Sequence, residues 1–200
     1  VKTEKYEKAL EVYRDMQSHN VKGSNVTYSI LVKLYTNQGE NEKAFTLLDE
    51  MRKNGVKPGI IVYTCLIQSS FKSKNYKRAL ALFETLKSEG LQADYVLYNT
   101  VVNGCLYHSQ WEQACKYTLE SFDKNVRMAN NIYKNVLDKM TMNYCHMNID
   151  LKCEYATKIL KQLKDKGVSI EDPTYKKISQ MIYKNNSTTQ NMKKYQKYRK

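Results

Sequence analysis

The chain has 200 residues and a formal net charge of +13, because 33 lysines and arginines outnumber 20 aspartates and glutamates. Hydrophobic residues make up 42% of it, with only seven glycines and two prolines, a composition that excludes collagen-like and fully disordered chains. No apolar run approaches the roughly 18 residues of a membrane span, and the first residues are charged, unlike an export signal. Since the chain does not begin with methionine, we expect a fragment whose targeting segment lies upstream.

The sequence repeats itself with a period of 35 residues, and three columns of identical or similar residues show it. One column holds tyrosine, at Tyr28, Tyr63, Tyr98 and Tyr133. A second holds alanine, at Ala9, Ala44, Ala79 and Ala114. A third holds only residues that tolerate a left-handed backbone at a helix end, at Asn20, Gly55, Gly90 and Asn125.

Each repeat is predicted to contain two helices, most clearly at 61–72 and 75–88, where apolar residues recur at helical spacing. In chain order, we expect a partial repeat at 1–24 with a helix from about 3 to 20, and full repeats at 25–59, 60–94, 95–129 and 130–171. A partial repeat follows at 172–184, and a basic, flexible tail at 185–200. Because one hairpin cannot bury both of its faces, the predicted fold is all-α, a right-handed α-solenoid of stacked two-helix hairpins.

The fourth repeat is predicted to be longer than the others. Its alanine and glycine columns reappear at Ala156 and Gly167 only after a shift of 42 residues, which implies about seven extra residues. We expect this insertion around Tyr144 to Asp150.

Several segments resemble consecutive parts of a pentatricopeptide repeat, and the resemblance extends from Lys5 to about Ile182. The segments that carry it are Val26–Tyr35, Glu42–Met51, Asn54–Pro58, Arg78–Glu84 and Tyr98–Gly104. The resemblance implies a single-stranded RNA-binding module in a mitochondrion or plastid that acts in RNA processing, stabilisation or translation. The alternative is an α-solenoid scaffold that binds proteins or structured RNA within an organellar assembly such as a ribosome.

The same resemblance implies which residues contact RNA. In the family, a residue near the start of the first helix and the last residue of the repeat together contact one base edge. These base-reading pairs are Thr64 with Asp94, Asn99 with Ala129, and Ser29 with Gly59. An aliphatic residue three places before each first member packs on base faces, at Val26, Ile61 and Val96. Lys72 occupies the place of a phosphate contact.

A purely structural interpretation competes with base reading at these positions. Thr64 suits the first turn of any helix, and Asp94 suits the cap of the next helix, where its carboxylate accepts unpaired amide hydrogens. The fourth repeat departs from the family pattern because it carries Lys134 and Glu171 as its pair and Asn131 in the packing place.

Nothing in the sequence assembles a reactive centre. His19, His108 and His146 lack a matched nucleophile, and no glycine-rich phosphate loop is present. The five cysteines are odd in number, lack a Cys-x-x-Cys pair and are expected to be reduced core residues. We therefore expect no enzyme, cofactor, metal, membrane or small-molecule substrate, and single-stranded RNA or proteins as partners.

Overall fold

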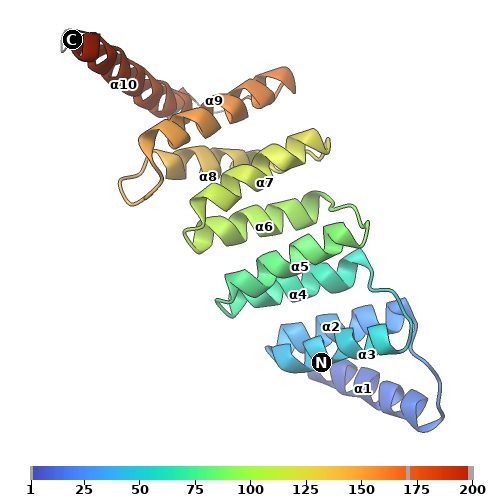
Figure 1. The fold of residues 1–200 in the computed structure, drawn as a ribbon. Coiled ribbons are helices and arrows are strands. Elements are labelled where there is room, and N and C mark those ends of the chain that lie inside the picture. Colours follow the sequence, from blue (N-terminus) through green and yellow to red (C-terminus); the bar gives the residue numbers. More distant parts are fainter. Residues whose placement is uncertain (1, 170–171, 198–200) are drawn as a thin grey trace. The chain divides into compact units, whose positions relative to one another are not determined.

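The computed structural model describes residues 2–169 and 172–197, which fall into two compact units, Val1–Ala93 and Asp94–Lys200. The first unit contains α1 (Lys2–Ser18), α2 (Asn25–Gln38), α3 (Asn41–Lys53), α4 (Ile60–Lys72) and α5 (Tyr76–Ser88). The second contains α6 (Tyr95–Tyr107), α7 (Trp111–Asp123), α8 (Asn130–Met140), α9 (Ile149–Asp165) and α10 (Asp172–Lys197) (Figure 1). The described residues contain no strand, so the all-α prediction is confirmed.

Consecutive helices pair into hairpins, and within each unit the hairpins stack on one another. In the first unit α2 packs on α3 and α4 on α5, while both α2 and α3 contact α4. In the second unit α6 packs on α7, α7 contacts both α8 and α9, and α10 packs on α8 and α9. Each predicted full repeat thus corresponds to one hairpin, because a single hairpin has a second apolar face that only its neighbour covers.

The tyrosine and alanine columns form the repeated core. The four column tyrosines are each at most 1% exposed, at Tyr28, Tyr63, Tyr98 and Tyr133. Alanine is fully buried in the second helix of each hairpin, at Ala44, Ala79, Ala114 and Ala156. A side chain as small as alanine lets the two helices of a hairpin approach closely, and the large tyrosine ring fills the space between hairpins.

Two of these tyrosines make the same kind of hydrogen bond, each to a glutamate at the equivalent place in its own repeat. The Tyr28 hydroxyl donates to Glu50 Oε1 at 3.0 Å, and the Tyr98 hydroxyl donates to Glu120 Oε1 at 2.9 Å. In both cases the carboxylate comes from the second helix of the same hairpin. A buried hydroxyl needs a partner, and this glutamate supplies it without breaking the backbone ladder.

The second repeat has threonine, Thr85, where the other two have this glutamate, and its tyrosine is satisfied differently. Arg52 donates to the Tyr63 hydroxyl at 3.0 Å and also to Glu89 Oε1 at 3.0 Å. Burial is the main reason that the pKa of Tyr63 is raised to about 12.

Helix ends follow the predicted column of left-handed residues. Asn20, Gly55, Gly90, Asn125 and Gly167 all have positive φ, between 55° and 78°. A second left-handed column, at the turn inside each of the first three hairpins, was missed because only Gly39 is a usual residue there, whereas Lys74 and Ser109 have φ of 60° and 57°. These two residues adopt a conformation that costs L-amino acids about 1 kcal/mol or more.

The predicted insertion in the fourth repeat is divided between a loop and a helix. The loop 141–148 separates α8 from α9, and α9 has 17 residues where α3, α5 and α7 have 13. The loop packs onto the hairpin before it: the Tyr144 ring lies 5.9 Å from the Trp111 ring, and Cys145 is 3% exposed. The insertion therefore adds to the core of the second unit.

The last helix is longer than predicted. We expected it to end near Lys184 and to be followed by a flexible tail, but α10 continues to Lys197. The physical reason is that 185–197 contains neither proline nor glycine, so nothing in the sequence terminates the helix there. None of the described helices is both long enough and apolar enough to cross a membrane.

Candidate RNA-binding surface

The first helices of the repeats keep large aliphatic side chains in solvent at one register. Val26, Ile61 and Val96 are 67%, 56% and 38% exposed, and each lies two residues before a buried column tyrosine. In α2 the exposed Ile30 extends this apolar area by one helical turn. We call the exposed sides that carry these residues, on α2 and α4 in the first unit and on α6 in the second, the first-helix face of each unit. Apolar side chains held in water at a repeated position are available to a ligand with flat apolar surfaces.

In the first three full repeats, the last residue is the N-terminal cap of the next first helix. Asp94 Oδ1 accepts the Leu97 N–H at 2.9 Å, so the capping interpretation of Asp94 is confirmed. Gly59 and Ala129 occupy the same place without a side-chain cap. Base reading and capping are compatible at Asp94, because the carboxylate is exposed and has further lone pairs.

The structure brings Asn99 and Ala129 together. The Ala129 N–H donates to Asn99 Oδ1 at 3.2 Å, which links the first turn of α6 to the last residue of the repeat. The amide nitrogen of Asn99 has no hydrogen-bond partner among the described residues, and the side chain is half-buried. Asn99 can therefore donate to the edge of a ligand while its carbonyl oxygen is fixed.

Ser29 and Gly59 lie on either side of Asn25. The Ser29 hydroxyl donates to the Asn25 carbonyl oxygen at 2.8 Å, and Asn25 Nδ2 donates to the Lys57 carbonyl oxygen at 2.8 Å. A Cβ on Gly59 would lie 3.1 Å from Asn25 Oδ1. Ser29 is only 8% exposed, so Asn25 offers more of its surface at this position than Ser29 does.

The Thr64 and Asp94 side chains belong to different units, and each is described by itself. The Thr64 hydroxyl is half-buried and donates to the Ile60 carbonyl oxygen at 2.8 Å, which leaves its oxygen able to accept from a ligand. In the fourth repeat Lys134 is half-buried and Asn131 is exposed, while Glu171 lies outside the described residues. Base reading at all these positions stays a prediction.

Two lysines of the first unit act electrostatically on the Cys65 thiol. Lys33 in α2 and Lys72 in α4 are both exposed, and both lower the pKa of the half-buried Cys65 thiol, although burial dominates and raises it overall. Lys72 was predicted to contact phosphate, whereas Lys33 was missed because it lies one helical turn before the expected place. In the third repeat that place is taken by Tyr107, whose ring is 76% exposed.

The remaining reactive side chains have other roles. The five cysteines are free, and burial raises the pKa of the Cys105 and Cys115 thiols to about 12, far from the range of a nucleophilic thiolate. Within the described part of the chain, no group of three or more His, Cys, Asp or Glu side chains could hold a metal ion.

Comparison with known proteins addresses the family and the fold. A sequence model described as pentatricopeptide repeat domain matches residues 11–69, and one described as PPR repeat family matches residues 58–106. No curated protein sequence matches the chain.

Solved structures share the arrangement of hairpins. The pentatricopeptide repeat protein PPR10, known from maize, in complex with an 18-nt psaJ RNA element is 20% identical with a TM-score of 0.57, covering 80% of this chain and 22% of that one. The PPR domain of Arabidopsis thaliana protein-only RNase P 1 in complex with tRNA is 16% identical with a TM-score of 0.68, covering 90% of this chain and 91% of that one. Nuclear proteinaceous RNase P 2 from A. thaliana is 11% identical with a TM-score of 0.61, covering 68% and 29%.

The chain spans about a fifth of the length of PPR10, and at these identities the likenesses show the fold, an α-solenoid of two-helix repeats. The 35-residue columns, the hairpins that they build and the two matching sequence models agree with one another. Residues 11–106 belong to the pentatricopeptide repeat family.

Proposed function

We propose that this chain is a single-stranded RNA-binding module, and that RNA binds to the first-helix face of each unit. The observation that carries the proposal is the exposure of Val26, Ile61 and Val96 at one register, next to tyrosines that are fully buried. A base that packs on such a side chain removes two apolar surfaces from water, and this contact is tolerant of sequence because every base has an apolar face. The RNA complexes of PPR10 and of the RNase P 1 domain support RNA as the ligand.

Polar and charged groups beside this apolar register suit the rest of a nucleotide. The amide nitrogen of Asn99 is free to donate to a base edge, and Lys33 and Lys72 suit backbone phosphates. With a net charge of +13, affinity should fall steeply with salt, since each neutralised phosphate releases counterions. We further propose that the module serves RNA processing, stabilisation or translation in a mitochondrion or plastid.

A second candidate is recognition of structured RNA, or of proteins, within an organellar assembly. The RNase P 1 domain supports it, because that domain is matched over nearly its whole length and its structure contains tRNA. The loop 141–148 and the altered pair of the fourth repeat also depart from a regular single-strand binder. In both candidates the module acts by binding its partner.

The experiment compares labelled single-stranded oligomers of each base with folded tRNA by fluorescence anisotropy, at about 50 and 200 mM salt. We expect single strands to bind more tightly than tRNA, and Thr64→Asn to change the preferred base at one position without changing the salt slope. Ile61→Thr should weaken binding about fivefold or more, since stacking contacts contribute about 1–3 kcal/mol per base. The matched control is Val12→Thr on α1, an aliphatic residue that is 59% exposed but lies outside the first-helix face.

Tighter binding of tRNA than of any single strand would favour the second candidate. Equal loss of affinity in the Ile61 and Val12 variants would contradict the proposed surface. Incubation with a tRNA precursor in the same series tests for cleavage, and a cleaved product would contradict the role of a pure binding module.

A further inference from the structure

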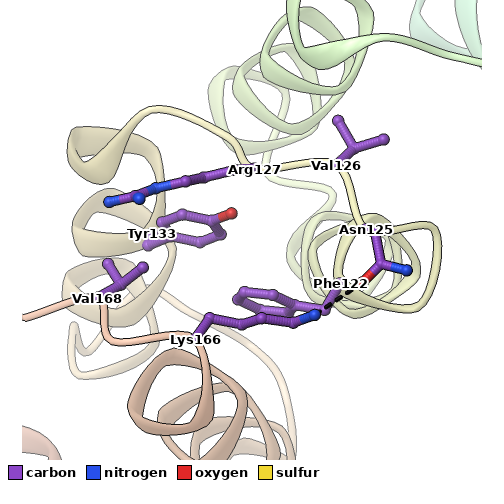
Figure 2. A pocket seen from close by; sticks show the side chains of 7 residues that line it. All are labelled: Phe122, Asn125, Val126, Arg127, Tyr133, Lys166 and Val168. Atoms are coloured by element: carbon purple, nitrogen blue, oxygen red, sulfur yellow. Dashed lines mark hydrogen bonds between the residues drawn. The ribbon is translucent and has the colours of Figure 1, made fainter.

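Two pockets occupy equivalent places in the two units, at the loop where a second helix leads into the next first helix. One lies in the first unit and is lined by Arg52, Lys57 and Glu89 among others. The other lies in the second unit, between the third and fourth repeats, and is lined by Phe122, Arg127 and Lys166 among others (Figure 2). In the repeat alignment Arg52 corresponds to Phe122, Lys57 to Arg127 and Glu89 to Lys166.

The first of these pockets neutralises its own charge. Arg52 donates to Glu89 Oε1 at 3.0 Å and to the Tyr63 hydroxyl at 3.0 Å. The Arg52 guanidinium is therefore already hydrogen-bonded within the protein. Of the residues that line this pocket, only Lys57 has a positively charged group without a hydrogen-bond partner. An anion would have to compete with Glu89 there.

The second pocket, by contrast, carries two cations and no acid. Lys166 Nζ donates to Asn125 Oδ1 at 2.7 Å, a neutral partner that leaves the ammonium charge uncompensated. Arg127 has no hydrogen bond or ion pair with any residue that the structure describes. Figure 2 shows Arg127 and Lys166 on opposite sides of the pocket. The change from Glu89 to Lys166 therefore turns an internal ion pair into a site that attracts anions.

The walls of the second pocket are apolar, and most of their surface is buried within the hairpins. The Phe122 and Tyr133 rings stack with centroids 5.1 Å apart and planes inclined by 11°, and Val126 and Val168 complete the lining. The pocket has a volume of about 110 Å³, and a water needs roughly 10–15 Å³ by the same measure.

The pocket is connected to a predicted base-reading pair through one short segment. The Met128 N–H donates to the hydroxyl of Tyr133 at 2.8 Å, and the next amide, that of Ala129, donates to Asn99 Oδ1 at 3.2 Å. Arg127 precedes both. An RNA strand at Asn99 and Ala129 thus passes within two residues of the pocket.

We propose that this pocket binds one nucleotide of the RNA, with its phosphate held by Arg127 and Lys166 and its base against the apolar wall. The inference rests on the proposed function. It adds a contact that does not depend on the RNA sequence, next to the fourth repeat, whose Lys134 and Glu171 depart from the base-reading pattern of the family. A nucleotide combines an anionic phosphate with a flat base, which matches the two cations and the apolar wall of this pocket.

The test is a titration of the whole chain with uridine 5′-monophosphate, followed by amide chemical shifts, with uridine and inorganic phosphate as separate probes. We expect uridine 5′-monophosphate to bind more tightly than either, and to shift the amides of residues 125–129 and 166–168. Arg127→Gln and Lys166→Gln should each weaken it roughly tenfold, because each removes a charge-assisted hydrogen bond. Lys166→Glu, which restores the charge found at Glu89, should abolish it.

Lys57→Gln at the equivalent pocket and Lys77→Gln on α5 are matched controls that each remove one exposed positive charge. If they weaken binding as much as Arg127→Gln, or if inorganic phosphate binds as tightly as the nucleotide, the pocket is not a nucleotide site. The Arg127 and Lys166 side chains are exposed, so the variants at these two positions are expected to fold. Unchanged amide spectra away from the pocket check this. Single-stranded RNA binding that depends on Ile61 while the nucleotide does not bind would overturn this inference alone.

Discussion

Replacement of Ala129 by aspartate should stabilise the second unit. Ala129 caps α8 without a side-chain hydrogen bond, and the Ile132 N–H donates instead to the Ala129 carbonyl oxygen at 2.9 Å. At the equivalent helix start the Leu97 N–H donates to the Asp94 side chain, and the next amide, that of Tyr98, reaches the Asp94 carbonyl oxygen at 3.0 Å. The uncapped helix has therefore tightened its first turn to satisfy an amide that aspartate would satisfy directly.

The expected gain lies in the lower half of the range for a helix cap. Replacing a good cap by alanine costs about 0.5–2 kcal/mol, and here part of that cost is already offset by the tightened turn. We therefore expect Ala129→Asp to raise the free energy of unfolding by about 0.5–1 kcal/mol, including a contribution of a few tenths from the helix dipole. Ala129→Asn should give the gain without the charge.

The same substitution should sharpen base preference at the third repeat. Asn99 already holds the Ala129 amide, so a carboxylate at 129 would lie beside the free Asn99 nitrogen and orient it. In the resembling family a polar residue at this place completes the pair, and Asn99 suggests a preference for pyrimidine. We expect pyrimidine oligomers to gain affinity relative to purine oligomers at constant salt.

Urea unfolding, hydrogen exchange at the Ile132 amide and the anisotropy series measure these effects. The matched contrast is Gly59→Asp: its Cβ would lie 3.1 Å from Asn25 Oδ1, so the same cap should not stabilise α4. A gain at 59 equal to that at 129, or faster exchange at Ile132 in Ala129→Asp, would refute the capping argument. A stabilised variant with unchanged base preference would refute only its extension to RNA.

Three further predictions concern stability. Lys74→Gly should raise the free energy of unfolding by about 0.5–1 kcal/mol because it relieves a left-handed lysine, whereas Gly39→Ala in the equivalent turn should lower it by about 1 kcal/mol; urea unfolding measures both, and a loss in Lys74→Gly would contradict the reasoning. Tyr98→Phe should cost about 1–2 kcal/mol, since it removes the hydroxyl that donates to Glu120, and an unchanged urea midpoint would show that water replaces that bond. The folded state raises the pKa of the Cys105 and Cys115 thiols from 9.0 to about 12, so the unfolded chain releases these protons first. The contribution of these thiols to stability should therefore be constant below about pH 9 and fall between about pH 9 and 12. Cys105→Ala should reduce the slope of the urea midpoint against pH in this range, and an equal slope would argue against the buried thiol as its source.

Sequence alone could predict the fold because repetition amplifies weak local signals. A single tyrosine indicates little, but four at a spacing of 35 residues indicate one environment used four times, and all four side chains are buried. The same logic failed where the column was degenerate. Gly39, Lys74 and Ser109 share a left-handed backbone, yet lysine and serine do not predict it in a sequence, because packing of the two helices imposes the turn.

The candidate site was predicted less completely, since function depends on contacts between repeats as well as on positions within one. Asn25 was not singled out from the sequence. Its side-chain amide donates a hydrogen bond to the Lys57 carbonyl oxygen, and this places it between Ser29 and Gly59, the two members of a predicted pair. Likewise, the replacement of Glu89 by Lys166 is visible only when the fourth repeat is aligned with the shift of 42 residues instead of 35, because the two residues lie at different distances from their column tyrosines. Irregular repeats conceal such charge reversals from a fixed period, so the pocket beside Arg127 follows from the packed hairpins and not from the columns. If this pocket binds a nucleotide of the RNA, it fixes which base lies at Asn99 in the neighbouring repeat, although the pocket itself does not distinguish bases. Lys166→Glu should then reduce the base preference at Asn99 as well as the affinity for RNA.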